Sequence, residues 1–204
     1  MYTAPYHHND NPEEIRAFIR SNGFGILVNT LQGKPWATHI PMLLDTNDTE
    51  QEVLVGHIAK ANPQWHHFVA QPDVLAIFTA YHAYVSASWY NHENVPTWNY
   101  IAVHCYGKIR IIESEKLHES LKKLVDKYEA HSEQPMRLEA MSEKMVQVQM
   151  RGIVGFEIAI EKIEANYKLS QNRNEEDYQR IILELERRGD EHSLNIAAEM
   201  RKRR

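Results

Sequence analysis

The chain contains a single cysteine, Cys105, among its 204 residues. One cysteine excludes an internal disulfide, and it excludes any zinc site or iron–sulfur cluster that needs several thiolates from one chain. It also favours a reducing compartment, so we expect a cytoplasmic protein. No apolar run approaches the roughly 20 residues of a membrane-spanning helix, and the N-terminus lacks the charged-then-apolar pattern of a secretion signal.

Several motifs of catalysis and cofactor binding are also missing. Gly23-Phe24-Gly25 lacks the third glycine of a dinucleotide-binding fingerprint, and no P-loop occurs. Neither His92-Glu93 nor His118-Glu119 is followed by the second histidine of a zinc-protease motif, so we expect no metal site. The net charge of −5 argues against binding nucleic acid through overall charge.

An aromatic stretch from Tyr81 to Gly107 is the most distinctive feature that the chain does have. It holds two of the four Trp and five of the ten Tyr residues, together with several histidines. Buried Trp N–H and Tyr O–H groups need hydrogen-bond partners, and such rings suit a pocket that stacks a flat ligand. An ordinary aromatic core is the alternative, and the stretch alone does not decide between them.

Alternating apolar residues and turn signals predict six strands, at 24–30, 36–44, 53–59, 74–85, 98–112 and 152–163. Helical spacing and capping residues predict helices that begin at Asn11, at Gln64, at Ser114, near Met141, at Asn174 and at Asp190. The short turns between strands indicate an antiparallel sheet rather than βαβ units. We therefore predict a β-rich α+β fold, a small antiparallel β-barrel with peripheral helices and a C-terminal helical segment.

Three polar segments are candidates for binding a phosphate. The first, 57–65, combines Lys60 and Asn62 at a proline turn, and the second, 168–173, contains two cations and no acid. The third is the basic tail 201–204. Each has a structural alternative: a solvated lysine with a helix cap, a solvated linker, or basic residues at the negative end of a helix.

Four sequence blocks occur in order along the chain: HIAKANPQW at 57–65, YVSASWY at 84–90, VPTWNYIAVHCYG at 95–107 and KLSQNR at 168–173. With these blocks the chain resembles the PaiB-type FMN-binding negative transcriptional regulators over essentially its whole length. It departs from them at Lys60, where arginine is more common, and at Ala87, where proline is common. The resemblance implies a split β-barrel, as in flavin reductases and pyridoxamine phosphate oxidases, with FMN as cofactor.

The resemblance also implies which residues contact the ligand. The cofactor-binding set is Thr38, His39, Lys60, Asn62, Thr97, Trp98, Asn99, Lys168, Gln171, Asn172 and Arg173. The substrate side of the pocket is lined by Ser86, Trp89 and Tyr90. We expect residues 1–165 to form the split-barrel domain, with a helical insertion near 114–150. Residues 166–204 are expected to add a polar linker and helices packed on the same domain.

The function implied by the resemblance is negative transcriptional regulation of extracellular protease production and sporulation, by a homodimer with flavin sites between subunits. DNA is a further implied partner, contacted directly or through another regulator. The alternative is an FMN-dependent oxidoreductase or flavin reductase that acts on a small molecule. The sequence assigns no catalytic residue; His39 and His104 are acid–base candidates, with a structural role as the alternative for each.

Overall fold

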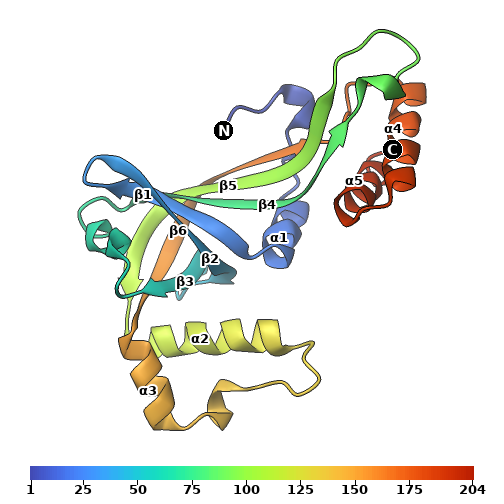
Figure 1. Cartoon of the computed structure of the whole chain (residues 1–204). Helices are drawn as coiled ribbons and strands as arrows, with labels where there is room; N and C mark the ends of the chain where they lie inside the picture. Colours follow the sequence, from blue (N-terminus) through green and yellow to red (C-terminus); the bar gives the residue numbers. More distant parts are fainter. The chain divides into compact units, whose positions relative to one another are not determined.

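Six strands form the centre of the fold in the computed structural model, which describes all residues from Met1 to Arg204 (Figure 1). They are β1 (Phe24–Leu31), β2 (Lys34–Thr46), β3 (Glu52–Ala59), β4 (Asp73–Val85), β5 (Thr97–Ile112) and β6 (Ile153–Lys168). Hydrogen-bonded neighbours follow the order β1-β2-β3-β6-β5-β4, and β1 pairs with β4 to close the barrel. The assigned pairs are antiparallel, so the predicted six-stranded antiparallel barrel is confirmed.

Five α-helices and four short 3₁₀ helices accompany the strands. The α-helices are α1 (Pro12–Ser21), α2 (Ser114–Glu129), α3 (Glu143–Arg151), α4 (Glu175–Arg188) and α5 (Glu191–Arg201). The 3₁₀ helices are η1 (Pro5–His7), η2 (Pro63–His67), η3 (Ala87–Trp89) and η4 (Leu138–Ala140). None of the helices is long and apolar enough to cross a membrane.

Local sequence signals explain where the C-terminal helices begin and end. The side chain of Asn174 accepts a hydrogen bond from the Asp177 backbone N–H at 2.8 Å, as the predicted cap of α4. Gly189 ends α4 with a φ of 74°, a conformation that glycine adopts without strain. Asp190 then caps α5 through the Ser193 N–H.

Residue contacts divide the chain into two compact units. The barrel unit contains residues 18–77 and 105–163, and the terminal unit contains residues 1–17, 78–104 and 164–204. Strands β4, β5 and β6 contribute residues to both units. The division at residue 165 expected from the sequence stays a prediction.

The barrel unit encloses a core of large apolar side chains. Its fully buried members are Ile19, Leu27, Met42, Leu54, Phe68, Phe156 and Ile158. A smaller cluster of Leu43, Val53 and Val55 packs against Leu124, which places α2 over the outer side of β2 and β3. Gly107 on β5 has a packing reason: a Cβ there would lie 2.1 Å from the Ala159 backbone oxygen of β6.

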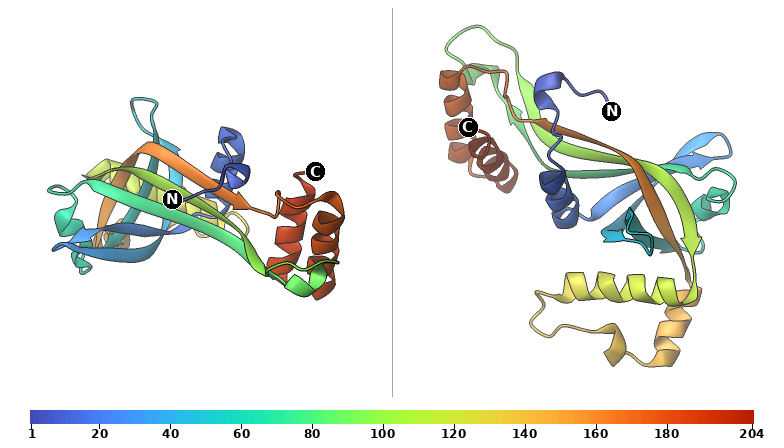
Figure 2. Two further views of the ribbon diagram at one scale, coloured as in Figure 1. Left: turned by 90° about the horizontal axis from the view of Figure 1, so that it is seen from above. Right: turned by 180° about the vertical axis from the view of Figure 1, so that it is seen from behind.

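The terminal unit has its own core, between α4 and α5. These helices lie side by side (Figure 2), and their inward faces bury Tyr178, Ile181, Leu185, Ile196 and Met200. The Tyr178 hydroxyl donates to the Met200 backbone oxygen at 2.7 Å, which satisfies a polar group inside this core.

Two elements differ from the sequence prediction in type or extent. Residues 64–70 were expected to form a helix, and the structure has the 3₁₀ helix η2 over Pro63–His67. Strand β6 continues past Ile163 to Lys168, because its exposed residues Glu161 and Lys162 interrupt the apolar pattern without interrupting the ladder. Lys168 therefore lies at the end of a strand and not in a linker.

Candidate functional site

A polar network fixes the turn that follows β3 in the barrel unit. Asn62 caps η2 by accepting from the Gln64 N–H at 3.0 Å, and its amide donates to Thr38 Oγ1 at 2.9 Å. Thr38 in turn donates to Gln64 Oε1 at 2.6 Å, and Gln64 Nε2 donates to the Leu27 backbone oxygen at 3.1 Å. The structure thus brings Thr38 and Asn62 together, and the hydrogen bonds of their side chains stabilise the turn.

His39 follows Thr38 on β2 and lies on the opposite face of the strand. Its side chain is exposed, and its ring stacks on that of Phe24 with centroids 6.5 Å apart. His39 remains available to a ligand or a partner, whereas Thr38 is bonded within the chain.

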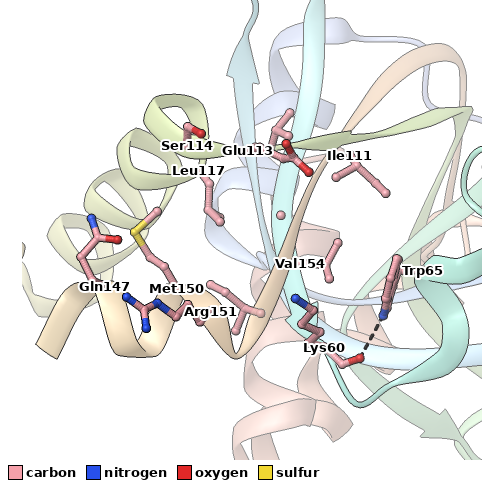
Figure 3. Close-up of a pocket in the computed structure, with 13 residues that line it drawn as sticks. Lys60, Trp65, Ile111, Glu113, Ser114, Leu117, Gln147, Met150, Arg151 and Val154 are labelled. Carbon is pink, nitrogen blue, oxygen red and sulfur yellow. Dashed lines mark hydrogen bonds between the residues drawn. The ribbon is translucent and has the colours of Figure 1, made fainter. Parts of the chain in front are cut away.

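Lys60 lines a cavity of about 370 Å³ in the barrel unit (Figure 3). The Lys60 backbone N–H donates to the Gly152 oxygen at 2.8 Å, and its carbonyl accepts from Trp65 Nε1 at 2.9 Å. These two bonds hold the residue, and its ammonium forms no hydrogen bond or ion pair with the chain. Thr38 and Asn62 do not line this cavity, so the ammonium is directed to a different space from the turn network.

The cavity is amphipathic. Leu117, Met150 and Val154 supply an apolar wall, and the charged residues Lys60, Arg151 and Glu113 lie around it. Its volume is within the range of roughly 300–1,000 Å³ found for small-molecule sites. Two cations against one carboxylate give it a positive balance, so it suits an anion that carries an apolar group.

A second group of expected residues meets at the end of β6 in the terminal unit. The Lys168 ammonium donates to Thr97 Oγ1, and it donates to the Trp98 backbone oxygen at 2.8 Å. Burial lowers the pKa of Lys168, and repulsion from Arg173 lowers it further. No carboxylate pairs with Lys168, so the cation is held by neutral oxygens and stays free of an acid partner.

The Trp98 side chain is 51% exposed, and its ring is part of an aromatic surface. The ring centroids of His82 and Tyr84 each lie 5.7 Å from that of Trp98. The Lys168 ammonium bonds the backbone oxygen of Trp98, so the exposed indole and a cation without an acid partner belong to the same residue contact, which suits a flat anionic ligand. This part of the aromatic stretch is therefore exposed, whereas Tyr90 is 7% exposed and belongs to the core.

Asn99 has a different environment from its neighbours Thr97 and Trp98. It is fully buried; its Oδ1 accepts from Ser170 Oγ at 3.0 Å, and its amide faces the Met200 sulfur at 3.4 Å. Ser170 adopts a φ of 62°, an uncommon conformation for a residue with a Cβ. Asn99 thus ties β5 to the 168–173 block and to α5.

Gln171, Asn172 and Arg173 lie at the surface or partly exposed. Gln171 Oε1 accepts from the Leu169 N–H at 2.8 Å and lies 2.8 Å from His7 Nδ1. Burial lowers the pKa of His7, while the hydrogen bond to Gln171 acts in the opposite direction. The Arg173 guanidinium lies 5.2 Å from the Tyr90 ring centroid, and Asn172 is exposed.

The residues expected on the substrate side are also in the terminal unit. Ser86 caps η3 by accepting from the Ser88 N–H, and the Trp89 ring lies under the Arg188 guanidinium at 4.8 Å. The buried Tyr90 hydroxyl has no hydrogen-bond partner. Ser86 and Trp89 therefore have structural contacts, and Tyr90 has one polar atom free.

Every residue of the basic tail has an acid partner. The pairs are Arg201–Glu186, Lys202–Glu199, Arg203–Glu14 and Arg204–Glu175. Arg204 also donates to the backbone oxygens of Gln171 and Arg173, at 3.1 and 2.9 Å. These contacts fit a structural role of the tail rather than phosphate binding. Through Arg204 the tail also holds the 171–173 segment in place.

Sequence reasoning missed Arg151 and Trp65 as neighbours of Lys60. Trp65 follows Lys60 by five positions, so the local turn could have indicated it. Arg151 is far away in sequence and reaches the cavity through the pairing of β3 with β6. No local pattern indicates that pairing.

A closed six-stranded antiparallel barrel with flanking helices is a fold that the chain shares with solved flavin-binding proteins. One solved structure with this fold is the FAD and heme binding protein from Mycobacterium smegmatis, with a TM-score of 0.63, 14% identity, and coverage of 85% of this chain and 79% of that one. The flavocytochrome Anf3 from Azotobacter vinelandii has a TM-score of 0.64 and 16% identity, over 87% of this chain and 78% of that one.

The chain belongs to the family described as "Putative FMN-binding domain", which it matches over residues 1–162. It is also 46% identical over 197 residues to the "Protease synthase and sporulation protein PAI 2" of Bacillus subtilis, covering 97% of this chain and 95% of that protein. These matches confirm the resemblance inferred from the four sequence blocks. The description of the family likewise supports the prediction of a flavin cofactor.

Proposed function

We propose that the chain is an FMN-binding regulator that lowers the transcription of genes for extracellular protease production and sporulation. The name of the Bacillus subtilis relative and the description of the family support this proposal. The observation that carries the flavin part is the Lys60 ammonium, which faces a cavity and has no acid partner within the chain.

The residues of the chain fit the groups of FMN. Lys60 offers a cation for a phosphate, and the apolar wall with Trp65 offers contact to a partly apolar ligand. In the terminal unit, taken by itself, the exposed Trp98 ring offers a stacking surface and the half-buried Lys168 ammonium offers a cation. Bound flavin supplies reversible electron and hydride transfer, while the protein residues bind and orient it.

The test is direct binding of FMN. Purified protein should show a flavin absorption band, or it should take up FMN in a calorimetric titration. We expect saturable binding of about one FMN per chain at micromolar concentrations. Absence of binding at tens of micromolar FMN would contradict the flavin part of the proposal.

We further propose that the chain acts as a homodimer. The outer face of β1 and its neighbours carries Phe24, Ile26, Val28, Leu75 and Ile77, none of which is buried. Phe24 is 63% exposed. Phe24 is exposed and the other four side chains are partly exposed, and an apolar face of this kind favours an interface with a second chain.

Regulation also requires contact with DNA, directly or through another regulator. A mobility-shift assay across a salt series distinguishes these routes, because direct phosphate contacts weaken steeply as salt rises. The oxidoreductase alternative is tested with the same preparation. Steady oxidation of NADH by the FMN-loaded protein would favour that alternative over a purely regulatory role.

A further inference from the structure

Strand register places a second cation beside Lys60. Ala59 of β3 pairs with Ile153 of β6, and the Lys60 N–H donates to the Gly152 oxygen at 2.8 Å. Arg151 directly precedes Gly152 as the last residue of α3. The backbones that carry Lys60 and Arg151 are therefore fixed next to one another by the pairing of two strands.

Both side chains border the same cavity in the barrel unit (Figure 3). Neither forms an ion pair with an acid of the chain. Some other cations of this unit do have acid partners: Lys108 pairs with Asp73, and Arg110 pairs with Glu157. Two cations that border one cavity repel one another, and an anion bound between them would reduce that repulsion.

The remaining lining of the cavity limits the class of anion. Leu117, Met150 and Val154 form an apolar wall, so the anion should be attached to a larger and partly apolar group. The first turn of α2 also borders the cavity, and Glu113 does not cap it with its side chain. The backbone N–H groups of this first turn of α2 produce a positive potential that favours a bound anion.

One feature of the lining opposes an anion. Glu113 borders the cavity with its carboxylate, and no ion pair neutralises it. A nearby carboxylate repels a phosphate dianion, so Glu113 should weaken binding and its neutralisation should strengthen it. Removal of a cation of this site should therefore weaken anion binding, whereas neutralisation of Glu113 should strengthen it.

We propose that Arg151 and Lys60 together bind the phosphate of the ligand, so that this site selects a phosphorylated flavin over its unphosphorylated form. The inference rests on the proposed binding of FMN and names the residues that would discriminate it from riboflavin. Lys60 supplies a point charge, while Arg151 supplies the planar guanidinium that can bond two phosphate oxygens at once. Both side chains are exposed, so rotation about their side-chain bonds brings the two groups to the phosphate.

Arg151 has a structural alternative. A basic residue in the last turn of α3 interacts favourably with the negative end of the helix, without any ligand. Arg151→Lys keeps that charge and loses the fork, whereas Arg151→Gln loses both. A purely structural residue would change the unfolding midpoint of the protein without ligand and would not change the preference for FMN over riboflavin.

Calorimetric titrations of the full chain with FMN and with riboflavin test the inference. We expect Arg151→Gln to weaken FMN binding about tenfold, Arg151→Lys to weaken it by a smaller factor, and riboflavin binding to stay unchanged in both. Glu113→Gln should strengthen FMN binding several-fold. Lys144→Gln is the matched control, because it removes one positive charge from an exposed position of α3 that does not line the cavity.

Equal effects of Arg151→Gln and Lys144→Gln would overturn the inference, as would an equal loss of FMN and riboflavin affinity. If the wild-type chain binds neither flavin, the proposed function fails, and the cation pair is judged with inorganic phosphate alone. Broadening of the ³¹P signal by the wild-type chain and its loss in Arg151→Gln would then support the pair. No broadening by the wild-type chain would overturn it.

Discussion

Gln64 shows how a single polar side chain can organise one end of the barrel unit. It is fully buried, and both ends of its amide are bonded: to Thr38 through Oε1 and to the Leu27 backbone through Nε2. A buried polar group that loses its hydrogen-bond partner destabilises the fold, because no water molecule reaches it to replace that partner. The turn that presents Lys60 and Trp65 therefore depends on this amide.

We expect Gln64→Leu to lower the free energy of unfolding by about 2–4 kcal/mol, because the Thr38 O–H loses its acceptor and the Leu27 carbonyl loses the donor that Gln64 supplies. Urea denaturation followed by Trp fluorescence measures the loss. Gln71→Leu is the control, since Gln71 is exposed and bonds only through its backbone. A similar loss in both variants would contradict the role given to Gln64.

The half-buried His57 makes stability depend on pH. Burial lowers the pKa of His57 below its ordinary value of 6.5. At a pH between the lowered pKa of His57 in the folded chain and its ordinary pKa in the unfolded chain, the unfolded chain binds more protons than the folded chain. The free energy of unfolding therefore falls as the pH is lowered through that window. The stability is fully present above pH 6.5 and is lost on acidification.

We expect His57→Gln to lose less stability than the wild type when the pH is lowered from about 7.5 to about 5.5. Urea midpoints at several pH values across this range measure the difference. His118→Gln on the exposed surface of α2 should follow the wild-type curve. Parallel curves for the wild type and His57→Gln would show that another group controls the acid sensitivity.

At the scale of elements, local signals and long-range pairings differ in how well the sequence predicts them. The Asn174 cap and the Gly189 stop depend on a few adjacent residues, and the structure confirms both. The contact between Lys60 and the Gly152 carbonyl depends on β3 pairing with β6 across nearly half of the chain. No short pattern encodes that register, which is why Arg151 was missed as a neighbour of Lys60.

The same distinction applies to the candidate site. The sequence identified Lys60, Lys168 and Trp98 by residue type, and their environments in the structure suit a flat anion. It could not reveal that Asn62 and Asn99 are bonded inside the chain, because an asparagine at a turn or on a strand can serve a ligand or the fold equally well.

Gly107 provides an element-scale prediction for the pairing of β5 and β6. We expect Gly107→Ala to destabilise the protein by about 3 kcal/mol, because its Cβ would meet the Ala159 backbone oxygen at 2.1 Å. Gly152→Ala is the control, since the nearest atom to its Cβ would be the Gln149 oxygen at 3.3 Å. Thermal unfolding of both variants tests this, and a loss no larger for Gly107→Ala than for the control would contradict it.

At the scale of the whole molecule, charge is largely compensated internally. All four residues of the basic tail pair with acids of the terminal unit, and the overall charge is −5. Such surface pairs each stabilise by only about 0–1 kcal/mol. A DNA phosphate could therefore compete with these carboxylates for the basic residues, although each residue of the tail is already paired within the chain.

The partly exposed apolar face of β1, with Phe24 at its end, leads to a prediction about assembly. We expect the wild-type chain to sediment at about twice its mass of 23.9 kDa. Phe24→Asp should convert it to a single chain, because it places a charge where an interface would exclude water. Val69→Asp is the matched control, since Val69 is 83% exposed and lies outside this face. Sedimentation of the two variants at equal concentration decides the matter. A dimer that survives Phe24→Asp, or one that Val69→Asp dissociates equally, would place the interface elsewhere.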